Sequence, residues 1–336
     1  MKSAASICAL ALAMTATVST TPRPAAGDGL LLVANKGDRT LGIIDTTAGQ
    51  QVTAVPENGI TGHEVIASPD GKTAYVPIYG DSGVGKAGSD GRHLIAVDIA
   101  SRRITGTLDF GHGVRPHCPM FGPKDGLLYV TTELDNSVTV IDPKTLKIVG
   151  MVPTGQAESH MLAITRDGKR GYTANVGPGT VSVLDLAAHK TIAVIPVANH
   201  TQRISLSVDD SMVFTSDTEQ PRLAVINTAT NKVEHWVTLP APGYGSAPTP
   251  DGKWLVIAVS SANKVAVIDL KTLAVAKTID VPAAPQEVLI RPDGKIAYVS
   301  CDQTGKIAAI RTSDWTVEKL IDAGKAADGL AWAAAH

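Results

Sequence analysis

Short apolar runs that end in a polar residue recur along the whole chain. The seven runs are LGIID, LIAVD, VTVID, VSVLD, LAVIN, VAVID and IAAIR, which end at positions 45, 98, 142, 185, 227, 269 and 311. Their ends are therefore 53, 44, 43, 42, 42 and 42 residues apart. This spacing predicts a repeat of just over about forty residues.

A second pattern, a turn followed by a strand, precedes six of these runs. It reads SPDGKTAYVP, GPKDGLLYVT, TRDGKRGYTA, SVDDSMVFTS, TPDGKWLVIA and RPDGKIAYVS. Asp-Gly pairs between alternating apolar runs are typical of hairpin turns. Four short strands in each repeat of this length indicate a β-propeller, an all-β fold.

The two ends of the chain complement each other. Residues 30–55 supply three strands but no innermost strand, whereas ADGLAWAAA at residues 327–335 supplies one strand of the innermost type. We therefore predict that strands within Gly29–Val55 and Asp328–Ala335 share one blade. The prediction is a single domain, residues 29–336, with seven blades in a ring closed by its N- and C-terminal strands.

Three segments resemble a known repeat. LLYVTTELDNSVTVID, KIAYVSCDQTGKIAAI and RGYTANVGPGTVSVLD are similar to the YVTN repeat of bacterial and archaeal seven-bladed propellers, and the resemblance covers roughly Leu30 to Ala335. The resemblance implies the fold but no single activity. Related propellers include lactonase-like proteins, haem-domain relatives of a nitrite reductase and subunits of quinoprotein dehydrogenases.

The first residues read as a targeting segment. MKSAASICALALAMTATVSTTPRPAAGDG has a lysine, then an apolar stretch too short to span a bilayer, then small residues and prolines. We expect residues 1–26 to be a signal peptide, cut between about Ala16 and Ala26, and the protein to be periplasmic or secreted. Cys8 would leave with this peptide, and Cys118 and Cys301 lie on separate repeats, so we expect two free thiols.

Composition excludes two classes of partner. The chain has 336 residues, 44% of them hydrophobic and 4% aromatic, and a formal net charge of -2. This balance predicts a soluble globular protein with no affinity for nucleic acid. No further segment is apolar and long enough to predict membrane insertion.

One residue of each repeat is predicted to face the mouth of the central channel. Counting seven residues back from each turn aspartate, with allowance for the extra Lys124, gives His63, His117, His160, Arg203, Tyr244, Gln286 and Asp328. Three successive blades thus present histidine. Neutral imidazoles converging from three sides would bind Cu, Fe or Zn and leave positions open for a substrate. A metal-free substrate site and a purely structural role are the alternatives.

The stretch HCPM adds a cysteine and a methionine to one of these histidines. Because strand side chains alternate, His117 facing the channel places Cys118 and Met120 in the packing between blades. HCPM is therefore not expected to be a metal motif by itself.

Weaker signals surround the histidines. Arg203, Glu133 and Tyr244 are the predicted catalytic residues, and Arg203 with Arg115 would suit an anionic small-molecule substrate such as a carboxylate. The Gly-rich insertion at residues 80–93 is expected to act as a lid. His93, His112 and His200 lie out of register and are not expected to be ligands.

Two functions remain open. One is a metal-dependent hydrolase, lyase or oxidoreductase built on the three histidines. The other is a non-catalytic propeller that docks a periplasmic oxidoreductase, either a quinoprotein or a cytochrome.

Overall fold

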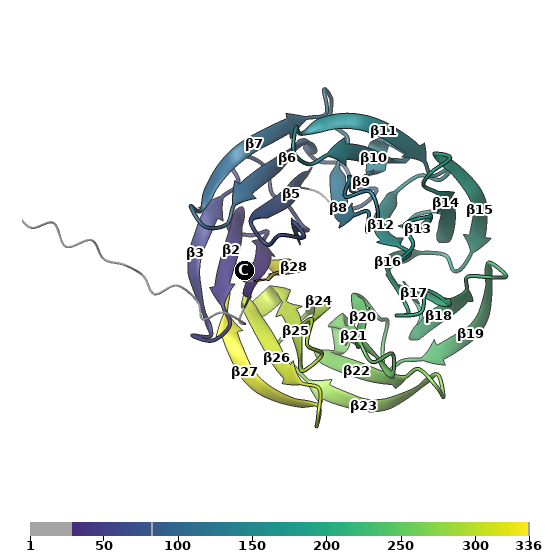
Figure 1. Ribbon diagram of the computed structural model, residues 1–336. Helices are drawn as coiled ribbons and strands as arrows, with labels where there is room; N and C mark the ends of the chain where they lie inside the picture. The colour runs from purple at the N-terminus through teal and green to yellow at the C-terminus, as the bar shows by residue number, and fades with distance from the viewer. Residues whose placement is uncertain (1–28, 82, 335–336) are drawn as a thin grey trace, which may run out of the picture.

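The repeats form a ring of seven four-stranded antiparallel sheets in the computed structural model, which describes residues 29–81 and 83–334 (Figure 1). The predicted seven-bladed propeller is confirmed. The predicted signal peptide lies outside the described residues. We number the blades along the chain, blade 1 being the one that contains both ends.

Each blade runs from an innermost strand to an outermost strand. Blade 1 contains β28 (Ala327–Ala333), β1 (Leu30–Asn35), β2 (Thr40–Asp45) and β3 (Gln50–Pro56). Blade 2 contains β4 (Ile66–Ala67), β5 (Thr73–Gly80), β6 (Asp90–Asp98) and β7 (Arg103–Asp109). Blade 3 contains β8 (Pro116–Phe121), β9 (Leu128–Thr132), β10 (Ser137–Asp142) and β11 (Lys147–Pro153).

The remaining blades follow the same plan. Blade 4 contains β12 (Ser159–Ile164), β13 (Arg170–Asn175), β14 (Thr180–Asp185) and β15 (Lys190–Pro196). Blade 5 contains β16 (Thr201–Leu206), β17 (Met212–Asp217), β18 (Arg222–Asn227) and β19 (Lys232–Thr238). Blade 6 contains β20 (Ser246–Pro248), β21 (Trp254–Val259), β22 (Lys264–Asp269) and β23 (Ala274–Asp280). Blade 7 contains β24 (Pro285–Ile290), β25 (Ile296–Cys301), β26 (Lys306–Arg311) and β27 (Thr316–Asp322).

Three 3-10 turns follow the second strand of their blades. They are η1 (Glu133–Asp135), η2 (Ser260–Ala262) and η3 (Asp302–Thr304). No helix in the described part of the chain is long and apolar enough to cross a membrane.

Blade 1 closes the ring. Strand β28 pairs antiparallel with β1, Leu32 lying opposite Ala331 and Leu30 opposite Ala333. The predicted closure by N- and C-terminal strands is therefore confirmed, and the innermost strand of this blade comes from the end of the chain.

Burial follows the position of a strand within its blade. All five residues of β9 are buried, whereas β11 is exposed from Lys147 to Val149 and at Met151, and is buried only at Val152. Middle strands are covered on both faces by neighbouring blades, so they carry continuous apolar runs, and outermost strands face solvent. This explains why the apolar runs of the middle strands dominate the sequence pattern.

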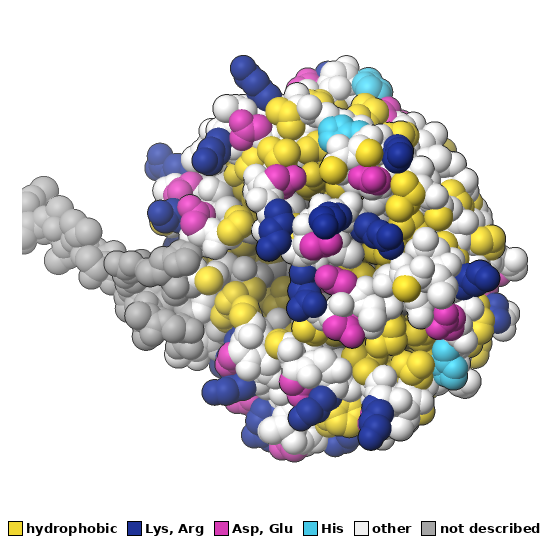
Figure 2. Space-filling view, turned by 45° about the vertical axis from the view of Figure 1, so that its right-hand side comes forward, with side chains coloured by type: hydrophobic (Ala, Val, Ile, Leu, Met, Phe, Trp, Pro, Cys, Tyr) yellow, Lys and Arg dark blue, Asp and Glu magenta, His cyan; other side chains and the backbone are white. Residues whose placement is uncertain are grey.

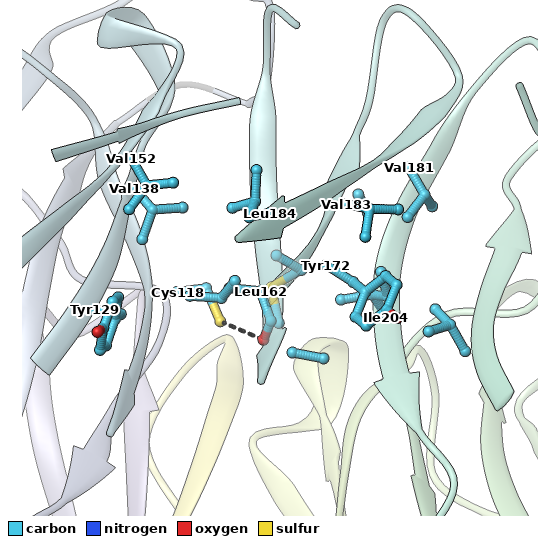
Figure 3. Packing of buried hydrophobic residues seen from close by; sticks show 14 of the residues in the cluster. Cys118, Tyr129, Val138, Val152, Leu162, Tyr172, Val181, Val183, Leu184 and Ile204 are labelled. Atoms are coloured by element: carbon cyan, nitrogen blue, oxygen red, sulfur yellow. Dashed lines mark hydrogen bonds between the residues drawn. The ribbon is translucent and has the colours of Figure 1, made fainter. Parts of the chain in front are cut away.

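The apolar core lies between blades. Cys118 packs in a cluster with Leu162, Tyr172 and Ile204 from the next two blades, and its thiol donates to the Leu162 carbonyl at 3.6 Å (Figure 3). This confirms the expectation that Cys118 belongs to the packing. Within the described residues Cys118 and Cys301 are both free and buried.

Candidate functional site

Strand pairing defines one equivalent position in every blade, at the start of the innermost strand. Ser159 lies opposite Asn175 in blade 4, and Thr201 lies opposite Asp217 in blade 5. The residue that follows is therefore equivalent from blade to blade. From blade 2 onward these residues are His63, His117, His160, Gln202, Tyr244, Gln286 and, in blade 1, Asp328.

The sequence-based register was wrong in blade 5. The Ser207 hydroxyl donates to Asp209 at 2.6 Å, which marks Asp209, not Asp210, as the turn aspartate. Counting from Asp209 gives Gln202, so Arg203 is one position further along its strand. The Arg203 side chain nevertheless reaches the centre of the ring, where it contacts Glu64 and Asp328 of other blades.

The structure brings the three histidines together. The ring centroids of His117 and His160 lie 3.6 Å apart at an interplanar angle of 31°, and those of His63 and His117 lie 5.6 Å apart. Tyr79, from β5, lies among them, with its ring centroid 4.7 Å from that of His63. The coincidence of three histidines in register therefore corresponds to one cluster in space.

These imidazoles are neutral and incompletely satisfied. Burial lowers the pKa of His63 to about 3 and also lowers the pKa values of His117 and His160. Nδ1 of His117 is buried without a hydrogen-bond partner among the described residues, whereas Nδ1 of His160 lies 3.5 Å from the Glu133 carboxylate. Buried polar atoms are normally hydrogen-bonded, so an unpartnered imidazole nitrogen in this cluster is a feature that a bound ligand would explain.

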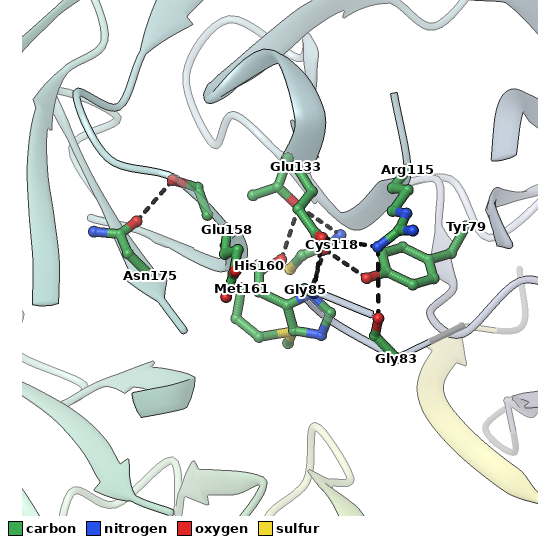
Figure 4. A network of polar contacts seen from close by, with 12 residues as sticks. Tyr79, Gly83, Gly85, Arg115, Cys118, Glu133, Glu158, His160, Met161 and Asn175 are labelled. Carbon is green, nitrogen blue, oxygen red and sulfur yellow. Dashed lines mark hydrogen bonds and ion pairs between the residues drawn. The ribbon is translucent and has the colours of Figure 1, made fainter. Parts of the chain in front are cut away.

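Glu133 stands beside the histidines at the start of η1. The turn ends at Asn136, which has a positive φ of 49° and whose backbone N–H donates a hydrogen bond to the Glu133 carbonyl. Both features direct the chain back into β10. The Glu133 carboxylate accepts a hydrogen bond from the Tyr79 hydroxyl at 2.5 Å and lies 3.5 Å from Nδ1 of His160 (Figure 4). Burial opposes its charge, but contacts with His160 and Tyr79 lower the pKa of Glu133, so it stays ionised.

Arg115 holds the inserted segment against this group. Its guanidinium donates to Asp90 at 2.7 Å and to the Lys86 carbonyl at 2.7 Å, and it lies 3.4 Å from Glu133. The described part of the insertion is thus tied to blade 3 beside the histidines, as Figure 4 shows for Gly83 and Gly85. A lid function stays a prediction.

A second buried cluster fills the centre of the ring. Arg203 donates to Glu64 at 2.5 Å, to Glu287 at 2.7 Å and to Asp328 at 3.1 Å. Lys36 adds an ion pair with Asp328 at 2.9 Å. Burial raises the pKa values of Glu64 and Glu287, which lie close together around the same guanidinium.

The predicted catalytic residues thus fall into two groups. Glu133 contacts the histidine cluster, whereas Arg203 and Tyr244 belong to the second cluster, the Arg203 guanidinium lying 4.7 Å from the centre of the Tyr244 ring. Their catalytic roles stay predictions.

Both arginines proposed to attract an anion are already paired with carboxylates. Around the two clusters stand six acids, Glu64, Asp90, Glu133, Glu287, Asp302 and Asp328, and three bases, Lys36, Arg115 and Arg203. Because burial raises the pKa values of Glu64 and Glu287, the excess of acids is smaller in charge than in number. The charge balance here favours a cation over an anion. On the outer surface, Figure 2 shows Lys and Arg interspersed with Asp and Glu over one face.

Sequence reasoning missed Tyr79, Glu64 and Glu287. Glu64 and Glu287 occupy the position that follows the channel residue, the same position as Arg203, and strand alternation directs such residues away from the channel. One sequence signal could have revealed them: the residue that follows the channel residue is charged in three blades, which is unusual for a position expected to pack between blades. By contrast, His93, His112 and His200 pair with surface acids outside the cluster.

The described residues contain no group of three or more His, Cys, Asp or Glu side chains that could hold a metal ion as they stand. The tilted stacking of His117 on His160 explains this, because stacked rings do not aim their nitrogens at one point. The donor set nevertheless fits a metal chemically, being neutral, buried and incompletely hydrogen-bonded. The two imidazoles would have to turn before all three histidines could share an ion.

Comparisons with known proteins support the fold alone. No protein-family model matches the chain, and no curated protein matches its sequence, so the YVTN resemblance stays a prediction. Hydrazine synthase of Kuenenia stuttgartiensis is a structural neighbour with a TM-score of 0.70 and 17% identity, covering 89% of this chain and 99% of that one.

Two further solved structures are similar. Dihydro-heme d1 dehydrogenase NirN in complex with DHE gives a TM-score of 0.67 at 14% identity, covering 94% of this chain and 78% of that one. A functionally unknown protein from Desulfotomaculum acetoxidans gives 0.75 at 12% identity, covering 92% and 100%. At these identities the likeness concerns architecture and not activity.

Proposed function

We propose that this protein is an exported metal-binding propeller in which His63, His117 and His160 hold one Cu, Fe or Zn ion at the mouth of the central channel. The observation that carries the proposal is the buried cluster of three neutral imidazoles, in which Nδ1 of His117 has no hydrogen-bond partner among the described residues. Neutral imidazole is the form that binds these metals, so no proton has to leave before binding.

The surroundings support a cation. Carboxylates outnumber basic groups around the two clusters, so bringing in a positive ion improves the local charge balance. Glu133 lies beside Nδ1 of His160 and is held in place by Tyr79 and Arg115. A carboxylate in this position orients a ligating imidazole through its Nδ1–H and leaves Nε2 free for the metal.

When bound, such a metal would supply a Lewis acid for hydrolysis or lyase chemistry, or a redox centre if it is Cu or Fe. Glu133 is the residue best placed to accept a proton beside it. Arg203 would act by fixing the carboxylates of the second cluster rather than by binding substrate, and Tyr244 lies over its guanidinium.

An oxidoreductase is the proposed partner. One structural neighbour, dihydro-heme d1 dehydrogenase, is by name a redox enzyme, and the predicted export would bring this protein into the compartment of periplasmic quinoproteins and cytochromes. If the protein is purified without metal and a cytochrome is purified together with it, a docking role without a metal is favoured.

Titration calorimetry tests the metal site. Metal-free protein titrated with Zn²⁺ and with Cu²⁺ should bind one ion per chain, and His63→Ala, His117→Ala and His160→Ala should each weaken binding at least about tenfold, a loss of about 1.4 kcal/mol. His189→Ala is the matched control, because His189 lies away from the cluster between β14 and β15. Cys118→Ser should keep the affinity.

Two results would contradict the assignment. One is equal affinity in wild type and all three histidine variants. The other is loss of metal in Cys118→Ser while His160→Ala still binds, because that would place the site at HCPM.

A further inference from the structure

A separate pocket of about 500 Å³ opens on the channel-mouth side of blades 5, 6 and 7. Gln202 and Tyr244, the residues equivalent to the histidines in blades 5 and 6, form its inner side. Thr218 after β17, Ser261 in η2 and Gln303 in η3 line it further out. The pocket and the histidine cluster thus occupy different parts of the same ring of positions.

The lining is polar but uncharged. None of the described residues that line this pocket is Asp, Glu, Lys, Arg or His, whereas amide and hydroxyl groups are plentiful. A charged ligand would therefore lose its hydration there without gaining an opposite charge. A neutral ligand with many hydrogen-bonding groups would not meet this penalty.

Several of these groups lack protein partners. The side chains of Gln202, Thr218, Ser261 and Gln303 make no hydrogen bond to another described residue, although each lines the pocket. An amide offers two donors and one acceptor, and a hydroxyl offers both functions. Such groups match the adjacent hydroxyls of a polyol, which also donate and accept.

Tyr244 adds a fixed aromatic surface. Its ring lies over the buried Arg203 guanidinium, which Glu64 and Glu287 hold in place, so the ring is positioned before any ligand arrives. Pro242 and Gly243 continue the lining beside it. An aromatic ring surrounded by a few polar groups is the usual composition of a small-molecule site.

We propose that this pocket binds a neutral saccharide, with Gln202 and Gln303 hydrogen-bonding its hydroxyls and Tyr244 packing against its ring. The site does not depend on a metal. It also differs from the anionic ligand expected from sequence, because the arginines behind that expectation are paired with carboxylates and Arg203 lies beneath the tyrosine.

Ligand-observed NMR on metal-free protein, prepared with a chelator, tests the proposal. The probes are maltose, trehalose and raffinose, with galacturonate as an anionic comparison. At least one neutral saccharide should bind, and Gln202→Ala and Gln303→Ala should each weaken that binding about threefold to tenfold, the loss expected for one or two hydrogen bonds. Gln220→Ala is the matched control, because Gln220 is exposed on the same blade and does not line the pocket.

Both glutamine variants should fold as wild type does, because the side chains of Gln202 and Gln303 make no hydrogen bond to another described residue. A loss of saccharide binding in them can therefore be assigned to the pocket. The proposal is overturned if none of the three saccharides binds, if galacturonate binds more tightly than all of them, or if the glutamine variants bind as wild type does. Because the protein carries no metal in this test, failure of the metal site would leave the result unchanged.

Discussion

Arg203 is a buried cation surrounded by acids. Its guanidinium is 3% exposed, and it pairs with Glu64, Glu287 and Asp328 from three other blades. Removing one partner of a buried ion pair leaves uncompensated charge, which costs more than the pair contributes. This residue therefore affects stability whether or not it takes part in catalysis.

We expect Arg203→Met to lower the free energy of unfolding at pH 7 by about 3–5 kcal/mol, because three carboxylates lose their shared cation. Urea unfolding measures this loss. Arg166→Met is the matched control, since Arg166 is exposed and its pair with Asp210 should contribute less than about 1 kcal/mol. Similar small losses in both variants would show that the central cluster is not held by Arg203.

Glu57 gives a prediction about pH. Burial raises its pKa from 4.5 to about 7, although the Gly62 amide, which donates to it at 2.8 Å, lowers it. Between these values the folded chain holds a proton that the unfolded chain has lost, so stability falls as the pH rises through this window. Glu57→Gln should therefore stabilise the protein by about 1–3 kcal/mol at pH 8 and by much less at pH 5.

Urea unfolding at the two pH values checks the effect, with the exposed Glu318→Gln as a control that should change neither. An equal gain for Glu57→Gln at pH 5 and pH 8 would mean that the carboxyl is not protonated in the folded state.

At the scale of strands, the repeat determined most of what could be predicted. Four of the turns use the same local hydrogen bond, from a Ser or Thr hydroxyl to the aspartate two residues later, as from Thr165 to Asp167. These turns and the strands that follow can therefore be predicted one repeat at a time. The register failed where SVDDS offers two aspartates, and the hydrogen bonds that Ser207 and Ser211 donate to Asp209 identify the correct one. The inward course of the Arg203 side chain toward Glu64 and Glu287 has no sequence signal of its own.

Ring closure by β28 leads to a truncation experiment. A chain ending at Gly324 loses β28, which exposes the inner edge of β1 and the apolar faces beside it, and we expect it to aggregate. A chain ending at Ala334 keeps the whole strand and should remain monomeric in size-exclusion chromatography. Cooperative unfolding of a soluble, monomeric Gly324 chain would contradict the role assigned to this strand.

At the scale of the whole molecule, the two clusters differ in how far sequence could anticipate them. His63, His117 and His160 occupy one position in successive repeats, so a count along the chain found them. The pairing of Arg203 with Glu64 and Glu287 joins blades that are not neighbours and becomes visible only once the ring is closed. For this reason the positive charges that were expected to attract an anionic substrate are in fact neutralised by neighbouring carboxylates.

Elemental analysis of the protein, expressed for export and purified without added metal or chelator, tests the central proposal most directly. Wild type should contain about one Cu, Fe or Zn per chain, and His117→Ala should contain little of any of them while keeping its melting temperature within a few degrees, because His117 is not part of the apolar packing between blades. Wild-type protein free of metal, or His117→Ala with an undiminished metal content, would contradict a metal site formed by the three histidines.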